Sequence, residues 1–228
     1  KISTGKLDLF GDTVADYNTT AAFDDVRALG TLAYISPNFS GFKFLAAIVP
    51  GSGTDHTSAD GLAEQFSVAL IYSANGIHAS AAYEDLGEND EKWRIGLGYK
   101  GNGFQVTFVW ENRDSDNSSH EYDTWTVQGG YNFGNNAIQA MWNTTDYDNG
   151  GDYDSWAIRF LHKMSKRTQV YILYVDSEKD LRFVSGSGRE GRAIYLGIRH
   201  KGYYRLATPS HEKRGLRAPF FFAQREEG

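Results

Sequence analysis

Residues 92–111 read KWRIGLGYKGNGFQVTFVWE, and this stretch decides the fold. Trp93, Ile95, Leu97 and Tyr99 alternate with polar or small residues, and the same period of two resumes at residues 104–111. A period of two predicts β-strands, and the Gly-Asn-Gly between them predicts a hairpin. The apolar face of this hairpin is large, with aromatic residues near both ends of each strand.

Two all-β architectures can use such a hairpin. A soluble sandwich buries the apolar face against a second sheet. A transmembrane barrel turns that face to lipid, with aromatic residues at the two water interfaces and polar residues toward the lumen. The choice between the two depends on the rest of the chain.

Composition narrows the classes of protein. The chain has 228 residues, a net charge of −6, a mean hydropathy of −0.50 and no Cys. No stretch approaches the 18 apolar residues of a transmembrane helix, although barrel strands are half polar and do not need one. The absence of Cys excludes disulfides, thiolate metal sites and a Cys nucleophile. The negative charge disfavours a nucleic-acid partner. The first ten residues lack a signal-peptide pattern, so we expect either a removed signal or an absent start.

The same alternation recurs along the chain and predicts about twelve strands. Long polar connections alternate with short tight turns, which is typical of an up-and-down outer-membrane barrel and has no cause in a Greek-key sandwich. We therefore predict an all-β, antiparallel, up-and-down transmembrane β-barrel. The expected strands are residues 1–10, 27–36, 42–48, 65–72, 77–83, 93–100, 104–111, 124–133, 138–142, 156–163, 170–174 and 194–201.

Three short stretches resemble a known family. They are SPNFSGF at residues 36–42, SKRT at residues 165–168 and LGIRHK at residues 196–201. Together they resemble the general diffusion porins of Gram-negative bacteria, in the Neisseria/Comamonas-type branch, over residues 1–201. The resemblance implies 16 strands, a homotrimer, an outer-membrane location and a third loop that folds into the barrel. On this pattern residues 1–10 are the fifth strand, residues 11–25 are the constriction loop, and four earlier strands precede this N-terminally truncated chain. The alternative is a smaller, complete barrel of twelve strands, whose lumen the third loop would crowd.

The C-terminal end departs from that family. Its members end in an aromatic residue just after the position of Lys201, whereas here Gly202 follows and a tail continues to residue 228. This tail has no alternation, and we expect it to lie outside the barrel. Residues 213–222 can be back-translated into a GC-rich inverted repeat and a T run, so one hypothesis is translated non-coding DNA. The other is an ordinary disordered extension, and the nucleotide sequence distinguishes them.

A porin of this kind would act through the charges and the width of its constriction. Strand parity predicts basic residues on the lumen wall, and the expected constriction loop supplies acidic residues that face them. The candidate pore-lining residues are Asp12, Asp16, Asp24, Asp25, Arg27, Lys43, Arg94, Arg159 and Arg199. A basic wall that faces an acidic loop would create an electric field across the lumen. The five basic residues on the wall favour the passage of anions. A second interpretation of each basic residue is an ion pair with a carboxylate on a neighbouring strand.

The other expectations concern the outward face, chemistry and partners. Outward aromatic residues such as Trp93 and Trp142 predict interface girdles, and small outward residues such as Ala79 and Ala81 fit a subunit interface or a thin lipid face.

We expect outer-membrane lipid, inorganic ions and small hydrophilic solutes as partners, and no catalytic residues, metal or cofactor. The alternative function is a barrel that acts as an enzyme or an adhesin. For an enzyme, Ser80 beside His78 is the nearest Ser–His candidate, but no acidic partner is in view.

Overall fold

The computed structural model describes residues 3–25, 30–49, 65–87, 89–116, 120–180, 190–200 and 222–224. One short helix precedes a twelve-stranded sheet. The elements are α1 (Tyr17–Thr20), β1 (Leu32–Ile35), β2 (Phe42–Val49), β3 (Gln65–Ala74), β4 (Ile77–Asp85), β5 (Asp90–Gly101), β6 (Phe104–Ser115), β7 (Tyr122–Phe133), β8 (Asn136–Tyr147), β9 (Tyr153–Lys163), β10 (Thr168–Asp180), β11 (Glu190–His200) and β12 (Phe222–Gln224).

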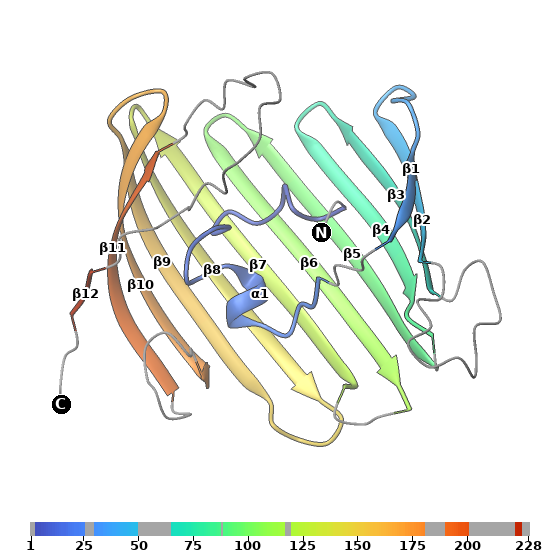
Figure 1. The fold of residues 1–228 in the computed structure, drawn as a ribbon. Coiled ribbons are helices and arrows are strands. Elements are labelled where there is room, and N and C mark those ends of the chain that lie inside the picture. The colour runs from blue at the N-terminus through green and yellow to red at the C-terminus, as the bar shows by residue number, and fades with distance from the viewer. Residues whose placement is uncertain are drawn as a thin grey trace, which may run out of the picture.

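The strands pair in sequence order, and every pair is antiparallel. The sheet curves into an open trough, and within the described residues no pairing joins β1 to β12 (Figure 1). This confirms the predicted antiparallel up-and-down architecture. In the described part of the chain, no helix is both long enough and apolar enough to cross a membrane.

Two-residue turns fix the register of the hairpins. Asn102 and Gly103 both have positive φ angles, 51° and 83°, as do Asn75 and Gly76, with 52° and 80°. Two positive φ angles define the type I′ turn, whose twist matches that of paired strands. The turn between β5 and β6 therefore sets Arg94 opposite Glu111.

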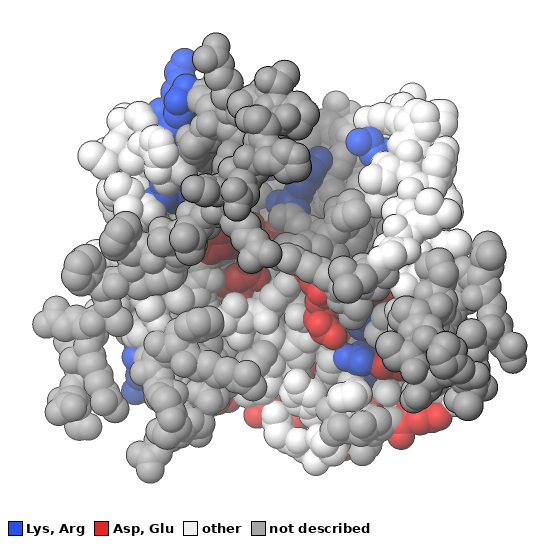
Figure 2. Space-filling view, in the orientation of Figure 1, with Lys and Arg blue, Asp and Glu red and all other residues white. Residues whose placement is uncertain are grey.

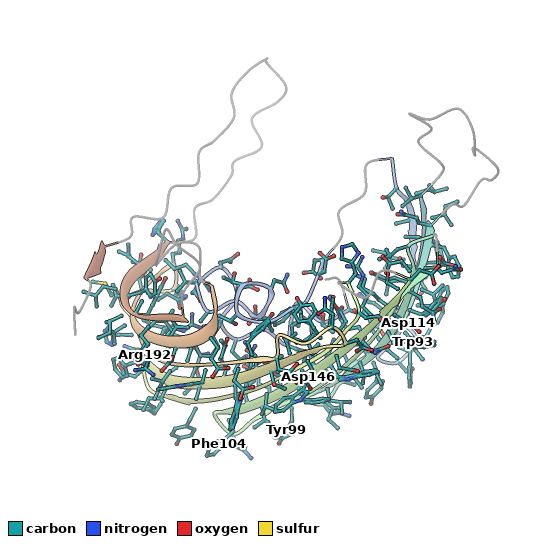
Figure 3. All side chains as sticks on the ribbon, turned by 90° about the horizontal axis from the view of Figure 1, so that it is seen from below. Trp93, Tyr99, Phe104, Asp114, Asp146 and Arg192 are labelled. Carbon is teal, nitrogen blue, oxygen red and sulfur yellow. The ribbon has the colours of Figure 1, made fainter. Side chains whose placement is uncertain are left out.

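The two faces of the sheet differ as the alternation predicts. Trp93, Tyr99 and Phe104 are about half exposed on the convex face, and Tyr99 and Phe104 project away from the trough (Figure 3). On this face large apolar side chains are left for lipid to cover. The concave face carries most of the polar residues and also holds the segment of residues 3–25, which we call the inner segment.

The strand predicted at residues 1–10 is absent from its described part, residues 3–10. Residues 3–10 form a series of turns, in which the Leu7 amide donates to the Thr4 carbonyl at 2.8 Å and the Phe10 amide donates to the Asp8 carboxylate at 2.9 Å. Leu7 and Phe10, three positions apart, are both buried against the wall. The prediction was wrong because Leu7, Leu9 and Phe10 fit a turn that buries two side chains as well as they fit a strand. The remaining eleven predicted strands are confirmed as β1–β11.

The strands are longer than predicted at the end of the long loops. β6 continues to Ser115 and β10 to Asp180, through stretches that were expected to be loops. Beyond the apolar band both faces of the sheet are polar, so alternation disappears from the sequence while the backbone pairing continues. β12 is a further strand, at residues 222–224 within the predicted tail, and it pairs with β11. The rest of the tail lies outside the described residues.

The inner segment packs on the wall through two apolar clusters. One joins Leu7, Tyr17, Ala21 and Phe23 to Val109 of β6. The other joins Phe10 and Ala15 to residues of β8–β11, namely Met141, Ala157, Leu173, Val175 and Tyr195. The concave wall beneath the segment is therefore apolar in places, and each large side chain buried there stabilises the contact by about 1.5–3 kcal/mol.

Candidate functional site

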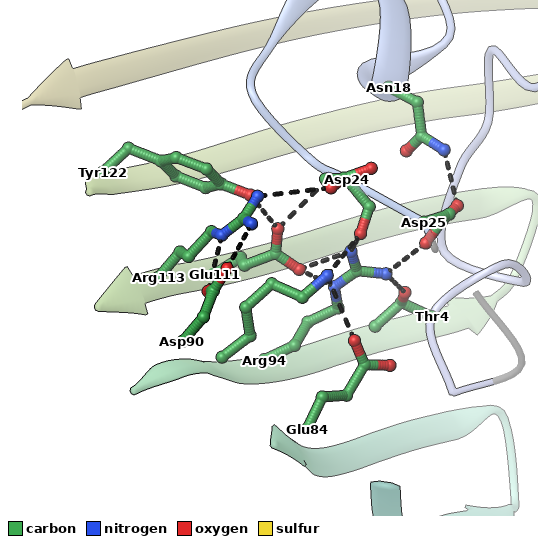
Figure 4. Close-up of polar contacts among 11 residues, drawn as sticks. Thr4, Asn18, Asp24, Asp25, Glu84, Asp90, Arg94, Glu111, Arg113 and Tyr122 are labelled. Carbon is green, nitrogen blue, oxygen red and sulfur yellow. Dashed lines mark hydrogen bonds and ion pairs between the residues drawn. The ribbon is translucent and has the colours of Figure 1, made fainter. Parts of the chain in front are cut away.

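Arg94 holds the C-terminal end of the inner segment on the wall (Figure 4). Its guanidinium forms an ion pair and a hydrogen bond with Glu111 on β6, and it forms a second ion pair with Asp25 at 2.7 Å. Arg94 is only 7% exposed, and Glu111 is fully buried. Among the candidate pore-lining residues, Arg94 therefore fits the second interpretation, an ion pair with the neighbouring strand, and it also anchors the segment.

Glu111 and Lys92 hold the backbone beside Asp25. Glu111 accepts hydrogen bonds from the Tyr122 hydroxyl at 2.8 Å and from the Asp24 amide at 3.2 Å. The Lys92 ammonium donates to the Asp24 carbonyl at 2.7 Å and pairs with Glu84 at 3.1 Å. The amide and the carbonyl of one residue are thus both bonded to wall side chains, which fixes the path of the chain at this point.

Asp24 itself points toward a more open part of the site. Its carboxylate lies 3.4 Å from Arg113, and its side chain is 49% exposed. Arg113 has a closer partner in Asp90 on β5, with two contacts of 2.5 and 2.8 Å. The Asp24 charge is therefore only partly balanced and remains accessible from the lumen side.

The environment of Asp25 favours its charged form. Burial alone would raise the pKa of this carboxyl, but the charge of Arg94 and hydrogen bonds from Arg94 and Asn18 outweigh burial and lower the pKa well below its usual range. The ion pair to Arg94 is consequently present at all pH values near neutrality.

Arg159 and Arg199 hold the N-terminal half of the inner segment in a different way. The Arg159 guanidinium donates to the carbonyl of Leu9 and to the Gln139 side chain, and it lies 4.8 Å from the centre of the Phe10 ring. Arg199 donates to the carbonyl of Gly11. Within the described residues no carboxylate is in ion-pair range of Arg159, and the only one near Arg199 is Asp12 at 3.8 Å.

Asp8 and Asp16 lie together on the inner segment. Asp8 accepts from Gln128 of β7 at 3.2 Å, and Gln128 in turn accepts from the Leu9 amide at 2.6 Å. Asp16 caps α1 by accepting from the Asn18 amide at 2.9 Å. Burial, and then the negative charge of Asp16, raise the pKa of Asp8 to about 7. This carboxyl is therefore partly protonated at neutral pH.

The remaining candidates are more scattered. Lys43 is exposed on β2, where it lines a recess of about 330 Å³ together with Lys6 and His78. Asp12 is almost fully exposed. Arg27 lies outside the described residues. The structure thus brings Arg94, Asp24 and Asp25 into one cluster and Arg159, Arg199 and Asp12 into another. Asp16 lies beside Asp8, and Lys43 belongs to neither cluster.

Sequence reasoning missed several residues of the site. Glu84, Asp90, Lys92, Glu111 and Arg113 belong to the Arg94 cluster, and Asp8, Gln128 and Gln139 contact the N-terminal half. The turn could have identified Glu111 and Arg113, because a two-residue hairpin at residues 102–103 pairs 94 with 111 and 92 with 113. Nothing in the sequence indicates that the inner segment reaches Gln128.

His78 is bonded to Ser73 and Ser3 and not to Ser80, the nearest Ser–His candidate in the sequence. Its Nε2 donates to the Ser3 carbonyl at 2.9 Å, which leaves Nδ1 to accept from the Ser73 hydroxyl at 2.6 Å. Ser73 is directly opposite His78 in the β3–β4 pair. Ser80 is buried against the inner segment, and its hydroxyl has no bond to His78.

Comparisons with known proteins agree with this architecture. A family model described as Gram-negative porin matches residues 2–180, so the chain belongs to the Gram-negative porin family. Membership of this family places the protein in the outer membrane. A comparison with curated proteins gives no match.

Several solved structures share the fold. The anion-selective porin from Comamonas acidovorans is 17% identical, with a TM-score of 0.56, over 87% of this chain and 65% of that one. A mutant porin of Rh. blastica is 20% identical, with a TM-score of 0.55, over 75% and 54%. OccK11 of Pseudomonas aeruginosa is 12% identical, with a TM-score of 0.56, over 74% and 58%. The chain therefore spans between 54% and 65% of the length of these three structures.

Proposed function

We propose that the complete protein is a passive diffusion pore for ions and small hydrophilic solutes, and that the inner segment narrows its lumen. The observation that carries the proposal is the attachment of this segment to the polar face of the sheet at both ends. Arg94, Lys92 and Glu111 bind residues 24–25, and Arg159 and Arg199 bind the carbonyls of residues 9 and 11.

A segment held in this way restricts the lumen without closing it. Two anchors prevent it from swinging out, and the apolar clusters beneath it exclude water from the contact. Water and solutes then pass along its other side, where Asp12 and Asp24 are exposed. Charged groups that line such a passage determine which ions enter it.

We further propose that the protein assembles as a homotrimer. Family membership supports this, as do the small residues Ala79 and Ala81 on the convex side of β4, where a second subunit could approach closely. The convex face elsewhere carries larger apolar residues, which suit lipid contact.

The test is single-channel conductance of the intact protein in a planar bilayer with KCl. We expect steady conductance in groups of three equal steps. Arg94→Met, which releases residues 24–25, should raise the conductance of each step, whereas Gly129→Ala, on the convex face with open space around it, should leave it unchanged. A folded protein without conductance would contradict the proposal and favour a barrel that acts as an enzyme or an adhesin.

A further inference from the structure

The topology separates basic and acidic residues to opposite ends of the sheet. All the two-residue turns lie at one end, which we call the short-turn end, and the described residues of this end are 36–43, 72–79, 98–107, 130–139, 160–171 and 196–200. None of these described residues is an Asp or a Glu. Lys or Arg occurs there at Lys43, Lys100, Lys163, Lys166, Arg167 and Arg199. The carboxylate that approaches this group comes from the inner segment, where Asp12 lies 3.8 Å from Arg199.

The opposite, long-loop end is acidic. Its described carboxylates include Asp85, Asp90, Glu91, Asp114, Asp116, Glu121, Asp123, Asp146, Asp148, Asp152 and Asp154. The Lys and Arg side chains described there are Lys92, Arg113 and Arg192. Each already pairs with a carboxylate, namely Glu84, Asp90 and Asp176. The excess charge at this end is therefore negative.

The space-filling view shows the same separation (Figure 2). Basic side chains occur at the upper rim, where the short turns lie, and acidic side chains occur in the middle and along the lower rim, where a few basic side chains also lie. Polar side chains of each end also line hollows. Lys6, Lys100 and His78 line a recess of about 490 Å³ at the short-turn end. Asp85, Asp90, Glu91, Asp114 and Asp116 line one of about 600 Å³ at the rim of the other end, where Asp85, Glu91 and Asp114 share the outward side of β4–β6 with Trp93.

Loop length assigns the two ends to the two sides of the membrane. Outer-membrane barrels have short periplasmic turns and longer external loops. The basic end therefore faces the periplasm, and the acidic end faces the outside. The transverse field expected from the sequence runs across the lumen, whereas this separation of charge runs along it.

We propose that the pore is electrostatically polarised along its axis, with an external mouth that concentrates cations and a periplasmic mouth that concentrates small anions, such as carboxylates and phosphates. The inference rests on the proposed function, because it needs an open pore. Its consequence is that the ion preference depends on the direction of a salt gradient. A pore whose charges lie mainly across the lumen has one preference in both directions.

Salt screening explains the direction dependence. The Debye length is about 3 Å at 1 M salt and about 30 Å at 0.01 M. The charges of a mouth in concentrated salt are screened, while those of a mouth in dilute salt act across its whole width. The dilute side consequently determines which ion is preferred.

The experiment is a pair of reversal potentials on the same intact channel, with the same KCl ratio applied in each direction. We expect the chloride-to-potassium permeability ratio to be higher, by about twofold or more, when the dilute solution bathes the short-turn end. Equal ratios in the two directions from a conducting channel would overturn the axial polarity and leave the proposed function intact. A folded channel without conductance would overturn both.

Two matched double variants show which end of the pore determines each permeability ratio. Lys163→Gln with Lys166→Gln removes two exposed charges at the short-turn end, and Asp114→Asn with Asp116→Asn removes two at the other. None of the four residues anchors the inner segment. Each pair should shift the ratio measured with dilute salt on its own side and leave the other ratio unchanged. A shift of the same ratio by both pairs, or of neither ratio by either pair, would overturn the inference.

Discussion

Arg94 and Arg159 lie on the same face of the sheet and both hold the inner segment, yet their partners differ. Arg94 is held by two carboxylates, one from β6 and one from the segment. Arg159 is held by a carbonyl, an amide oxygen and an aromatic ring, with no described carboxylate in ion-pair range. One anchor is thus electrically balanced, while the other keeps its positive charge.

This difference separates mechanical and electrostatic roles that strand parity cannot distinguish. A balanced buried arginine contributes position, because its field is cancelled at short range. An unbalanced one contributes position and field together, at the cost of burying a charge. Arg94 therefore fixes where the passage runs, and Arg159 with Arg199 also makes its wall positive.

The largest expected effect tests this contrast directly. Arg94→Met should lower the free energy of unfolding by about 3–5 kcal/mol, because it leaves the buried carboxylates of Glu111 and Asp25 without the guanidinium that balances their charge. Arg159→Met leaves only neutral acceptors unpaired and should cost about 1–3 kcal/mol. Denaturant unfolding in lipid vesicles, followed by tryptophan fluorescence, measures both. Equal losses for the two variants would show that the carboxylates do not make the difference.

A second prediction concerns Gly96 and Gly98 of β5, against which Leu7 of the inner segment packs. A Cβ at Gly96 would lie 2.6 Å from Leu7, and one at Gly98 would lie 2.5 Å from it, so Leu7 requires glycine at both positions. Gly96→Ala should destabilise the protein by about 1–3 kcal/mol through overpacking and should change its conductance. Gly129→Ala, with nothing within 4 Å of the added Cβ, is the matched control. An unchanged conductance in Gly96→Ala would mean that the contact between Gly96 and Leu7 does not position the inner segment.

The two halves of the segment should also respond oppositely to acid. The pKa of Asp8 is raised from about 3.8 to about 7, so its contribution to stability is full below pH 3.8 and is lost as the pH rises through 7. Between these values the slope is at most about 1.4 kcal/mol per pH unit. The pKa of Asp25 is lowered, so its contribution is full above pH 3.8 and is lost only as the pH falls below that value.

Unfolding free energies measured between pH 3 and pH 8 test these two opposite pH dependences. Asp8→Asn should remove part of the gain in stability that accompanies acidification from pH 7 to pH 5. Asp25→Asn should lower the stability by a constant amount between pH 5 and pH 7, and it should change the pH dependence only below pH 4. A pH profile of Asp8→Asn that matches the parent across pH 5–7 would contradict the raised pKa of Asp8.

The smallest effect is expected at Asp24. Asp24→Asn breaks a 3.4 Å ion pair of a half-exposed side chain and should change the unfolding free energy by only about 0–1 kcal/mol. Its backbone bonds to Glu111 and Lys92 remain. The same variant should still shift the reversal potential toward anions, because the carboxylate is accessible from the lumen. A loss as large as that of Arg94→Met would place Asp24 among the buried anchors.

Much of the sheet was predictable, and little of the inner segment was. Alternation located the strands from residue 42 to residue 200, since a face turned to lipid must be apolar at every second position. It failed at residues 3–10, where Leu7 and Phe10 are buried by turns instead of a strand. Parity placed Lys43, Arg94, Arg159 and Arg199 on the inner face, but it could not show which of them would meet a carboxylate.

The sequence by itself determined the strand pattern, the two faces, the tight turns and, through the turn at Asn102-Gly103, the pairing of Arg94 with Glu111. These features depend on neighbours in the chain or across one hairpin. The tertiary structure alone decided that residues 9–11 meet Arg159 and Arg199, and that residues 24–25 meet Arg94. Such contacts span up to 188 positions in the chain and depend on the curvature of the whole sheet, which no local pattern encodes.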